Sequence, residues 1–522
     1  MPRPIQRTRS WRSASADATV LLLASCGLGT GCAEVPCGPR LRCEPPAPVE
    51  EAPPCPDEPE KGLEATDKCG VFVSSSLGED ENPGTRKAPV KTIARAIELL
   101  DEEPELHPRI HACAEPFPEA VRVRGTLEIW GGFDCKRRWS HHGGGRNTMI
   151  EPGPDEIPLT FEADAAATIF DLEAQSALAT EPGGSSIAAI VLEGARVTLH
   201  RGALIAGDGA PGRDGAPGDP KNASARAGHH GRFGQDACTG DFVPGADEVE
   251  AGCAQGGSMG GRGGDGTIDH GGPGGDGELT PLPNPGGFGL GGQGATSTDG
   301  CLAGQTGADG LDGAHGLGGR GLGTFDTQGL YLGVNGGDGG DGLPGQGGGG
   351  GGGTRAGAMF CGSSRNAGSA SGGSGGSGGC GGRGGHGGGH GGASIGLMIL
   401  NARVDIHGTT IEAARGGDGG HGGMFQIGGA PGLGAPGGQG FGGSPFGCSG
   451  GDGGKGGNGG HGGGGQGGPS IAIAVVGASL PAVMEAQLRA GTGGKGGLGA
   501  NPSVPGSAGD DGLAIDLAGF PQ

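Results

Sequence analysis

The chain of 522 residues has few aromatic side chains, with 3% Phe, Trp and Tyr, including three Trp and one Tyr. Few rings are therefore present on which an enzyme could stack sugars. The apolar run Ala18 to Ala24 is too short to span a bilayer. The motif H-E-x-x-H and the P-loop are also missing. These absences exclude the enzyme classes that those motifs define.

Positive charge is scarce as well. Lys and Arg number 35 against 57 Asp and Glu, so the formal net charge is −22. Removing residues 1–25, which contain four Arg and one Asp, makes the charge −25. So acidic a chain is a poor ligand for nucleic acid or for an anionic bilayer surface. No nucleic-acid partner is therefore expected.

The first 25 residues have the pattern of an export signal. Four Arg precede the apolar stretch, which ends in Leu23-Ala24-Ser25-Cys26. These four residues resemble a bacterial lipobox, which implies cleavage before Cys26 and lipidation of that cysteine. The alternative is an ordinary signal peptide that is cut nearby. The pattern predicts an exported, lipid-anchored protein at the outer membrane or cell surface.

Fourteen cysteines fit an oxidising compartment. Without Cys26 thirteen remain, so at least one is free or pairs between molecules. Residues 26–68 are rich in Pro and Glu, a composition that prefers extended conformations and cannot bury a core. This stretch is predicted to be a tether.

Regular structure is expected to begin at "CGVFVSSSLGEDENPGTRKAPVKTIARAI", residues 69–97. A short strand is followed by G-x-D-x-N-P-G-T, then P-x-K-T-I and a helix. Thr92 can cap that helix, whose apolar residues follow at helical spacing over 93–100, and Pro104 ends it. The segment resembles the N-terminal portion of an uncharacterised bacterial family with a pectate-lyase-like right-handed parallel β-helix. The resemblance implies the fold and no particular reaction.

Three segments of the chain repeat one pattern. They begin "SIAAIVLEG" at 186, "SIGLMILNA" at 394 and "SIAIAVVGA" at 470. Each contains an apolar strand, a turn and a second strand, and each is followed by glycine-rich sequence. Repeats of this kind form stacked units. We expect an all-β, right-handed parallel β-helix with an N-terminal capping helix, in which Ile187, Ile395 and Ile471 occupy equivalent inward positions.

The predicted division of the chain follows from these patterns. It comprises a signal peptide (1–25), a tether (26–68), the N-terminal part of the β-helix (69–206), a glycine-rich insert (207–393), a β-helix coil (394–414), a second insert (415–469), and the last coil with a tail (470–522). Both inserts should leave the coil at one point and return to the next strand, because loop-closure entropy grows slowly with length.

The inserts contain long Gly-Gly-X runs such as "SGGSGGSGGCGGRGGHGG" at 371–388. Three residues per turn is the period of a polyproline II helix. Since two of three positions lack a Cβ, neighbouring backbones can approach and exchange hydrogen bonds. We favour packed glycine-rich helices over a flexible linker. Ser374, Cys380, Arg383 and His386 are predicted to lie on the outer face.

Two metal hypotheses remain open. "GGDGGDGLP" at 336–344 matches a calcium-binding nonapeptide, which makes Asp338 and Asp341 candidate calcium ligands, although consecutive copies are missing. Cys380, His386 and His390 have a spacing that zinc could use. The alternative is that the third-position side chains form a solvated face that binds no metal. No cofactor is therefore predicted, apart from weak calcium binding as an option.

The function expected from the sequence is a non-catalytic structural, adhesive or matrix-contact role. The partners are a membrane, through the lipid anchor, and extracellular polysaccharide or cell-surface components. The alternative is a polysaccharide lyase or hydrolase acting in a groove of the β-helix, since scattered Asp and Arg could meet in space. Fold analogy is a weak argument for a reaction. Three or more carboxylates beside a Lys or Arg on one face would favour the enzyme.

Overall fold

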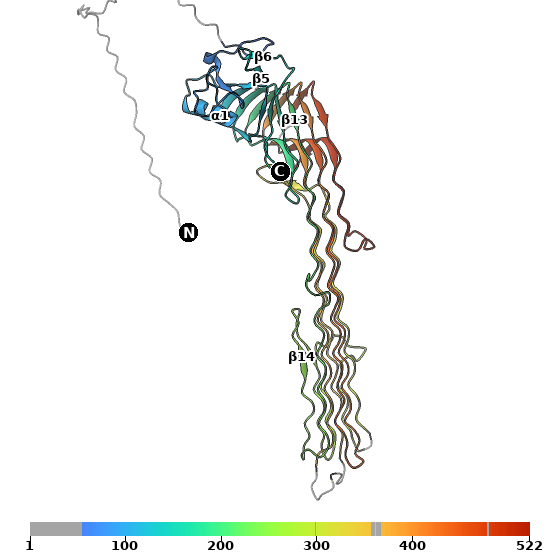
Figure 1. Cartoon of the computed structure of the whole chain (residues 1–522). Coiled ribbons are helices and arrows are strands. Elements are labelled where there is room, and N and C mark those ends of the chain that lie inside the picture. Colours follow the sequence, from blue (N-terminus) through green and yellow to red (C-terminus); the bar gives the residue numbers. More distant parts are fainter. Residues whose placement is uncertain (1–54, 298, 357–360, 362–366, 478–479, 522) are drawn as a thin grey trace, which may run out of the picture. The chain divides into compact units, whose positions relative to one another are not determined.

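The computed structural model describes residues 55–297, 299–356, 361, 367–477 and 480–521. The predicted signal peptide, Cys26 and most of the tether lie outside these residues. The described residues belong to one unit that begins at Cys55. It combines a β-helix with long extended segments (Figure 1).

The β-helix consists of three sheets whose strands follow one another in turn along the chain. The first contains β1 (Val71–Val73), β2 (Arg109–Cys113), β5 (Thr126–Asp134), β9 (Ala166–Phe170), β12 (Arg196–His200), β19 (Arg403–His407) and β22 (Ala482–Met484), with β6 (Ser140–His141) antiparallel to β5. The second contains β3 (Pro116–Phe117), β7 (Thr148–Ile150), β10 (Leu172–Gln175), β13 (Ala203–Ile205), β20 (Thr410–Glu412) and β23 (Gln487–Arg489). The third contains β4 (Val121–Val123), β8 (Leu159–Phe161), β11 (Ser186–Val191), β18 (Ser394–Leu400), β21 (Ser470–Val476) and β24 (Ala514–Phe520).

All other pairings within these sheets are parallel, which confirms the predicted parallel β-helix. The three sequence repeats lie in register, since Ser186 pairs with Ser394 and Ser394 with Ser470. Strand β24 continues the third sheet beyond the residues that the repeat predicted. Two antiparallel hairpins lie outside the coil: β14 (Val249–Ala251) with β15 (Ser258–Gly260), and β16 (Thr324–Phe325) with β17 (Tyr331–Leu332).

Helix α1 (Ile93–Glu102) packs against β1, β2 and β4 at the N-terminal end of the coil. The Thr92 hydroxyl accepts the N–H of Arg95 at 3.1 Å, so the predicted cap is present. Asp80 in turn accepts the N–H groups of Lys91 and Thr92. A 3₁₀ helix (Asp67–Cys69) precedes β1. The G-x-D-x-N-P-G-T stretch therefore positions the start of the helix.

Apolar side chains form two main clusters around the third sheet. Val191, Leu397 and Ile399 belong to the large cluster inside the coil. Ile187, Ile395 and Ile471 belong instead to a second cluster with Tyr331 of β17. The three isoleucines are equivalent in register, but the prediction that they point inward is wrong. The hairpin β16–β17 covers them, and its position could not be read from the repeat.

The inserts leave the coil after the second sheet and return at the third, as predicted. Three buried serines, Ser186, Ser394 and Ser470, form a ladder at these points. The hydroxyl of Ser394 donates to the carbonyl oxygen of Gly207 (2.7 Å) and accepts the N–H of Ala414 (2.8 Å). Ser470 makes the same two bonds with Ala414 and Gly491 one coil later. Ser394 and Ser470 therefore join the start of an insert to the strand at which the chain returns.

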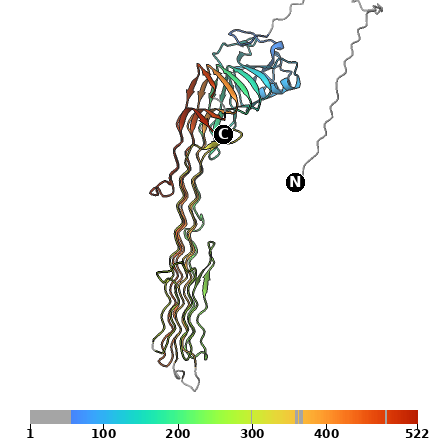
Figure 2. The same ribbon diagram turned by 180° about the vertical axis from the view of Figure 1, so that it is seen from behind.

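The glycine-rich segments lie side by side (Figure 2) and exchange main-chain hydrogen bonds every third residue. We call these segments the glycine array. It consists of the described residues within 209–237, 258–278, 289–319, 334–354, 367–392, 416–439, 447–468 and 491–512. In one pair, Gly336, Gly339 and Gly342 donate to the carbonyl oxygens of Gly388, Gly385 and Gly382. The repeat of three residues is that of polyproline II helices. This confirms the prediction that the inserts are packed glycine-rich helices and not a flexible linker.

Close approach explains the glycines. A Cβ on Gly378 would lie 1.9 Å from the carbonyl oxygen of Gly345, and one on Gly379 would lie 2.1 Å from that of Gly429. Segment 367–392 is central, because its residues bond to 210–232, 261–264, 336–351, 417–438 and 448–466. Ser374 and Cys380 are consequently buried, and only Arg383 and His386 of the four predicted outer residues are exposed.

Candidate functional site

Third-position side chains in the glycine array serve its backbone. Asp309 accepts the N–H of Lys455 (2.7 Å), and Asp312 accepts that of Asn458 (2.6 Å). His315 Nδ1 accepts the N–H of His461 (3.0 Å). The main-chain pattern gives the N–H groups of Lys455, Asn458 and His461 no carbonyl partner, and these side chains bind them. Buried N–H groups without acceptors are costly, so the side chains stabilise the packing.

The candidate calcium ligands have the same role. Asp338 accepts the N–H of Gly387 (2.7 Å), and Asp341 accepts that of Gly384 (2.8 Å). Each carboxylate is therefore engaged with a different turn of segment 367–392. Across the described residues, no group of three or more His, Cys, Asp and Glu side chains is arranged to hold a metal ion.

The candidate zinc ligands are not assembled. Cys380 forms a disulfide with Cys253, so its sulfur is not a thiolate ligand. His386 Nδ1 lies 3.6 Å from a carboxylate oxygen of Asp338. His390 Nδ1 lies 3.1 Å from the carbonyl oxygen of Gly391. The spacing that suggested zinc instead places residues along one glycine-rich segment, where Cys380 lies inside and His386 outside.

The described residues contain five disulfides, of which Cys55–Cys69 and Cys113–Cys135 lie beside the β-helix. Of the other three, Cys301–Cys448 joins two segments of the glycine array, Cys253–Cys380 joins one segment to the hairpin β14–β15, and Cys238–Cys361 joins two loops beside the array. They close loops of more than a hundred residues, which strongly constrains the unfolded chain. Five disulfides indicate an oxidising, extracytoplasmic environment. The helices of the described chain are all too short or too polar to cross a bilayer.

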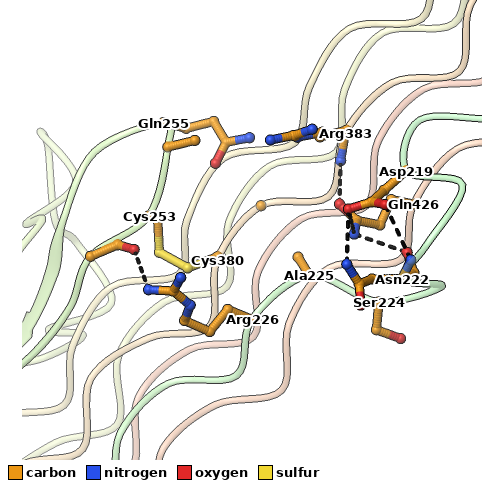
Figure 3. Close-up of a pocket in the computed structure, with 13 residues that line it drawn as sticks. Asp219, Asn222, Ser224, Ala225, Arg226, Cys253, Gln255, Cys380, Arg383 and Gln426 are labelled. Atoms are coloured by element: carbon orange, nitrogen blue, oxygen red, sulfur yellow. Dashed lines mark hydrogen bonds between the residues drawn. A yellow bond between two sulfur atoms is a disulfide. The ribbon is translucent and has the colours of Figure 1, made fainter.

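A pocket of about 350 Å³ lies on the glycine array where one segment is interrupted (Figure 3). Gly218 donates to the carbonyl oxygen of Met424, and Ala225 donates to that of Ile427. Between them, Asp219 to Ser224 leave the triplet pattern and form one wall. Asp219 Oδ1 accepts the N–H groups of Lys221 and Asn222, which closes the turn.

Gln426 holds this wall against the central segment. Its side chain is 5% exposed. Its Oε1 accepts the N–H of Arg383 (3.1 Å), and its Nε2 donates to the carbonyl oxygen of Asn222 (3.0 Å). On the opposite wall, the disulfide Cys253–Cys380 fixes the turn that carries Gln255.

The charges of the pocket come from Arg226, Arg383 and Asp219. Hydrogen bonds from the N–H of Lys221 and from the Asn222 side chain, and then the charge of Arg383, lower the pKa of Asp219. The carboxylate is therefore ionised at neutral pH. In Figure 3, Gln255 and Arg383 point toward each other, and Arg226 lies beside the disulfide. The pocket was not predicted from the sequence. The sequence feature that marks it is the break of the triplet pattern at "DPKNAS", residues 219–224.

A buried ionic group lies at a turn of the β-helix. Asp171 accepts hydrogen bonds from His141 Nε2 (3.0 Å) and from Arg201 Nη2 (2.9 Å). Burial would raise the pKa of Asp171, but the bonds from His141 and Arg201 lower it. His141 Nδ1 accepts the N–H of Gly143, so both ring nitrogens are occupied. This His–Asp pair is structural, because no ring nitrogen is free to take a proton from a substrate.

Comparisons of the chain with protein-family models, with curated proteins and with solved structures found no significant match.

Proposed function

We propose that this chain is an exported surface protein with a structural, adhesive or matrix-contact role and without catalysis. In this proposal Cys26 carries the lipid anchor, the Pro- and Glu-rich stretch is the tether, and the β-helix belongs to the pectate-lyase-like type. The observation that carries it is the glycine array. Its segments exchange main-chain hydrogen bonds every third residue, and three disulfides tie the segments and the loops beside them together.

Exposed apolar side chains on the array support a contact role. Phe233 is 74% exposed, Leu311 is 72% exposed and Phe446 is 68% exposed. Phe233 and Phe446 line one depression together with Pro436. Apolar groups that face solvent on a surface that cannot collapse are typical of contact sites.

The proposal is tested with cells that display the full chain. Adhesion to a surface coated with bacterial extracellular polysaccharide should fall several-fold when Phe233 and Phe446 are both replaced by Ser. A Leu178→Ser variant is the matched control, because Leu178 is 57% exposed and lies outside the array. Equal adhesion of all three chains would contradict the contact role.

The anchor needs its own test. Metabolic labelling with a lipid analogue should mark the wild-type chain and should not mark a Cys26→Ser variant. If both chains are labelled equally, Cys26 is not the lipidated residue.

One observation favours the alternative, hydrolysis of a polysaccharide on the β-helix. Burial and the nearby charge of Glu151 raise the pKa of Glu173 in β10. A carboxyl with a raised pKa beside a second carboxyl is the arrangement of a general acid and its partner. Release of reducing sugar from polygalacturonate by the wild type, lost in Glu173→Gln, would establish the enzyme.

A further inference from the structure

Two arginines in the pocket of Figure 3 have unused hydrogen-bond donors. Arg226 donates one guanidinium N–H to the carbonyl oxygen of Gly252 (3.0 Å). The guanidinium of Arg383 makes no hydrogen bond or ion pair with any residue that the structure describes. Two guanidinium groups thus face one pocket in a chain of net charge −22. The planar donor fork of arginine suits a carboxylate.

The acidic residue of the pocket does not neutralise them. Asp219 lies within ion-pair distance of neither arginine among the described contacts. Its oxygens accept from the backbone of Lys221 and Asn222, from Asn222 Nδ2 (3.2 Å) and from Gln426 Nε2 (3.4 Å). Asp219 therefore builds the wall. The charge of Arg383 acts on it, but neither guanidinium forms an ion pair with it, so both keep donors for a ligand.

The size and lining of the pocket limit the classes of ligand that it can bind. A volume of about 350 Å³ exceeds what a single small anion fills and lies within the range of small-molecule sites. Besides the charged groups, the lining contains the hydroxyl of Ser224 and no aromatic ring. It also contains the amides of Asn222 and Gln255, whose nitrogens donate to Asp219 (3.2 Å) and Asp341 (3.4 Å). Amide and hydroxyl groups match the hydroxyls of a sugar.

We propose that this pocket binds a carboxylated sugar unit of an extracellular polysaccharide, with its carboxylate on Arg383 and Arg226 and its hydroxyls toward Gln255 and Ser224. The inference rests on the proposed contact role of the glycine array and names its ligand. The disulfide Cys253–Cys380 and the buried Gln426 hold both walls before binding, which reduces the entropy that the ligand must overcome.

The test is calorimetric titration of the full chain with trigalacturonate in a buffer near physiological ionic strength, where long-range repulsion from the acidic chain is screened. Trigalacturonate should bind, and the neutral galactose trimer and inorganic phosphate should bind at least about tenfold more weakly. Arg383→Gln and Arg226→Gln should each weaken binding about tenfold, the effect of a lost charge-assisted hydrogen bond. Arg213→Gln is the matched control, because Arg213 is an exposed arginine of the interrupted segment outside the pocket.

Equal losses in the Arg383 and Arg213 variants, equal affinity for the neutral trimer or for phosphate, or no binding of trigalacturonate would each overturn the inference. Circular dichroism of each variant shows whether the fold is intact. If trigalacturonate does not bind and the adhesion test succeeds, only this inference fails. If trigalacturonate binds and adhesion does not depend on the array, the contact role fails.

Discussion

The β-helix and the glycine array differ in what they bury: mainly side chains in the β-helix and mainly backbone in the array. In the β-helix, side chains stack in register, as Val197 does with Val404 and Leu199 with Ile406, and they fill the coil. In the array most of the buried material is the backbone itself, with small side chains such as Ser374 between the segments, and larger side chains lie mainly at outer positions. The β-helix is stabilised by apolar area that leaves water. The array is stabilised by main-chain hydrogen bonds between backbones that approach so closely only because glycine lacks a Cβ.

The number of glycines in a triplet follows the number of neighbouring segments. Segment 367–392 is surrounded, and it reads Gly-Gly-X with small, buried serines at 371, 374 and 377. The segment 304–319 lies beside fewer segments, and its triplets from 304 to 315 carry one glycine each. Its other two positions hold residues such as Leu311, which is exposed, and Asp312, which binds a neighbour's N–H. Glycine content therefore reports local burial.

The largest expected effect breaks the array. Gly378→Val would place a Cβ 1.9 Å from the carbonyl oxygen of Gly345, so the segments must separate. We expect a local loss of about 4 kcal/mol or more, seen as lost protection of neighbouring amides from hydrogen exchange. Gly337→Ala is the control, since the nearest atom to its Cβ would be 3.3 Å away. Exchange in the wild-type array as fast as in a free peptide would show that it is a linker.

The second prediction removes a buried side chain from the β-helix. Ile406→Ala removes a fully buried side chain from the coil and should cost about 3 kcal/mol. Leu311→Ala in the array should change stability by less than about 0.5 kcal/mol, because Leu311 is exposed. Chemical denaturation measures both values. Similar losses in the two variants would contradict the division between buried side chains and buried backbone.

Acid should weaken the N-terminal part of the β-helix. Burial, and then the charge of Arg109, lower the pKa of His111 to about 3. Its unfolded pKa is near 6.5, so the folded state holds the ring neutral. The stability is then present above pH 6.5 and is lost as the pH falls toward 3. With half of the shift discounted, the loss is about 2 kcal/mol. Thermal melts across this window should show it, and His111→Phe should flatten the dependence; an unchanged slope would refute it.

The smallest effect concerns the serine ladder, where the two regions meet. Ser394→Ala leaves the N–H of Ala414 and the carbonyl oxygen of Gly207 without this partner. A loss of about 1–2 kcal/mol is expected, with faster hydrogen exchange at the base of both inserts. Ser507→Ala is the comparison, because Ser507 is also buried and lies away from the ladder. Equal exchange at the insert bases in the two variants would show that the ladder does not join the regions.

Much of the fold was predictable because its signals are local. The Thr92 cap, the helix after it and the register of the three repeats follow from short patterns. Strand β24 was missed because its repeat is degenerate. The inward placement of Ile187 was wrong because the covering hairpin is distant in sequence. The pocket was missed because its walls come from segments that the sequence does not bring together.

The sequence by itself determined a period of three, a repeated coil and the places where the inserts leave it. Only the tertiary structure decided which third positions are inside, so that Ser374 and Cys380 are buried while Arg383 and His386 face solvent. It also decided that Cys380 pairs with Cys253 and that Asp338 binds a backbone N–H instead of standing free. The physical reason is that a period defines the faces of a segment, whereas burial depends on how many other segments pack against each face.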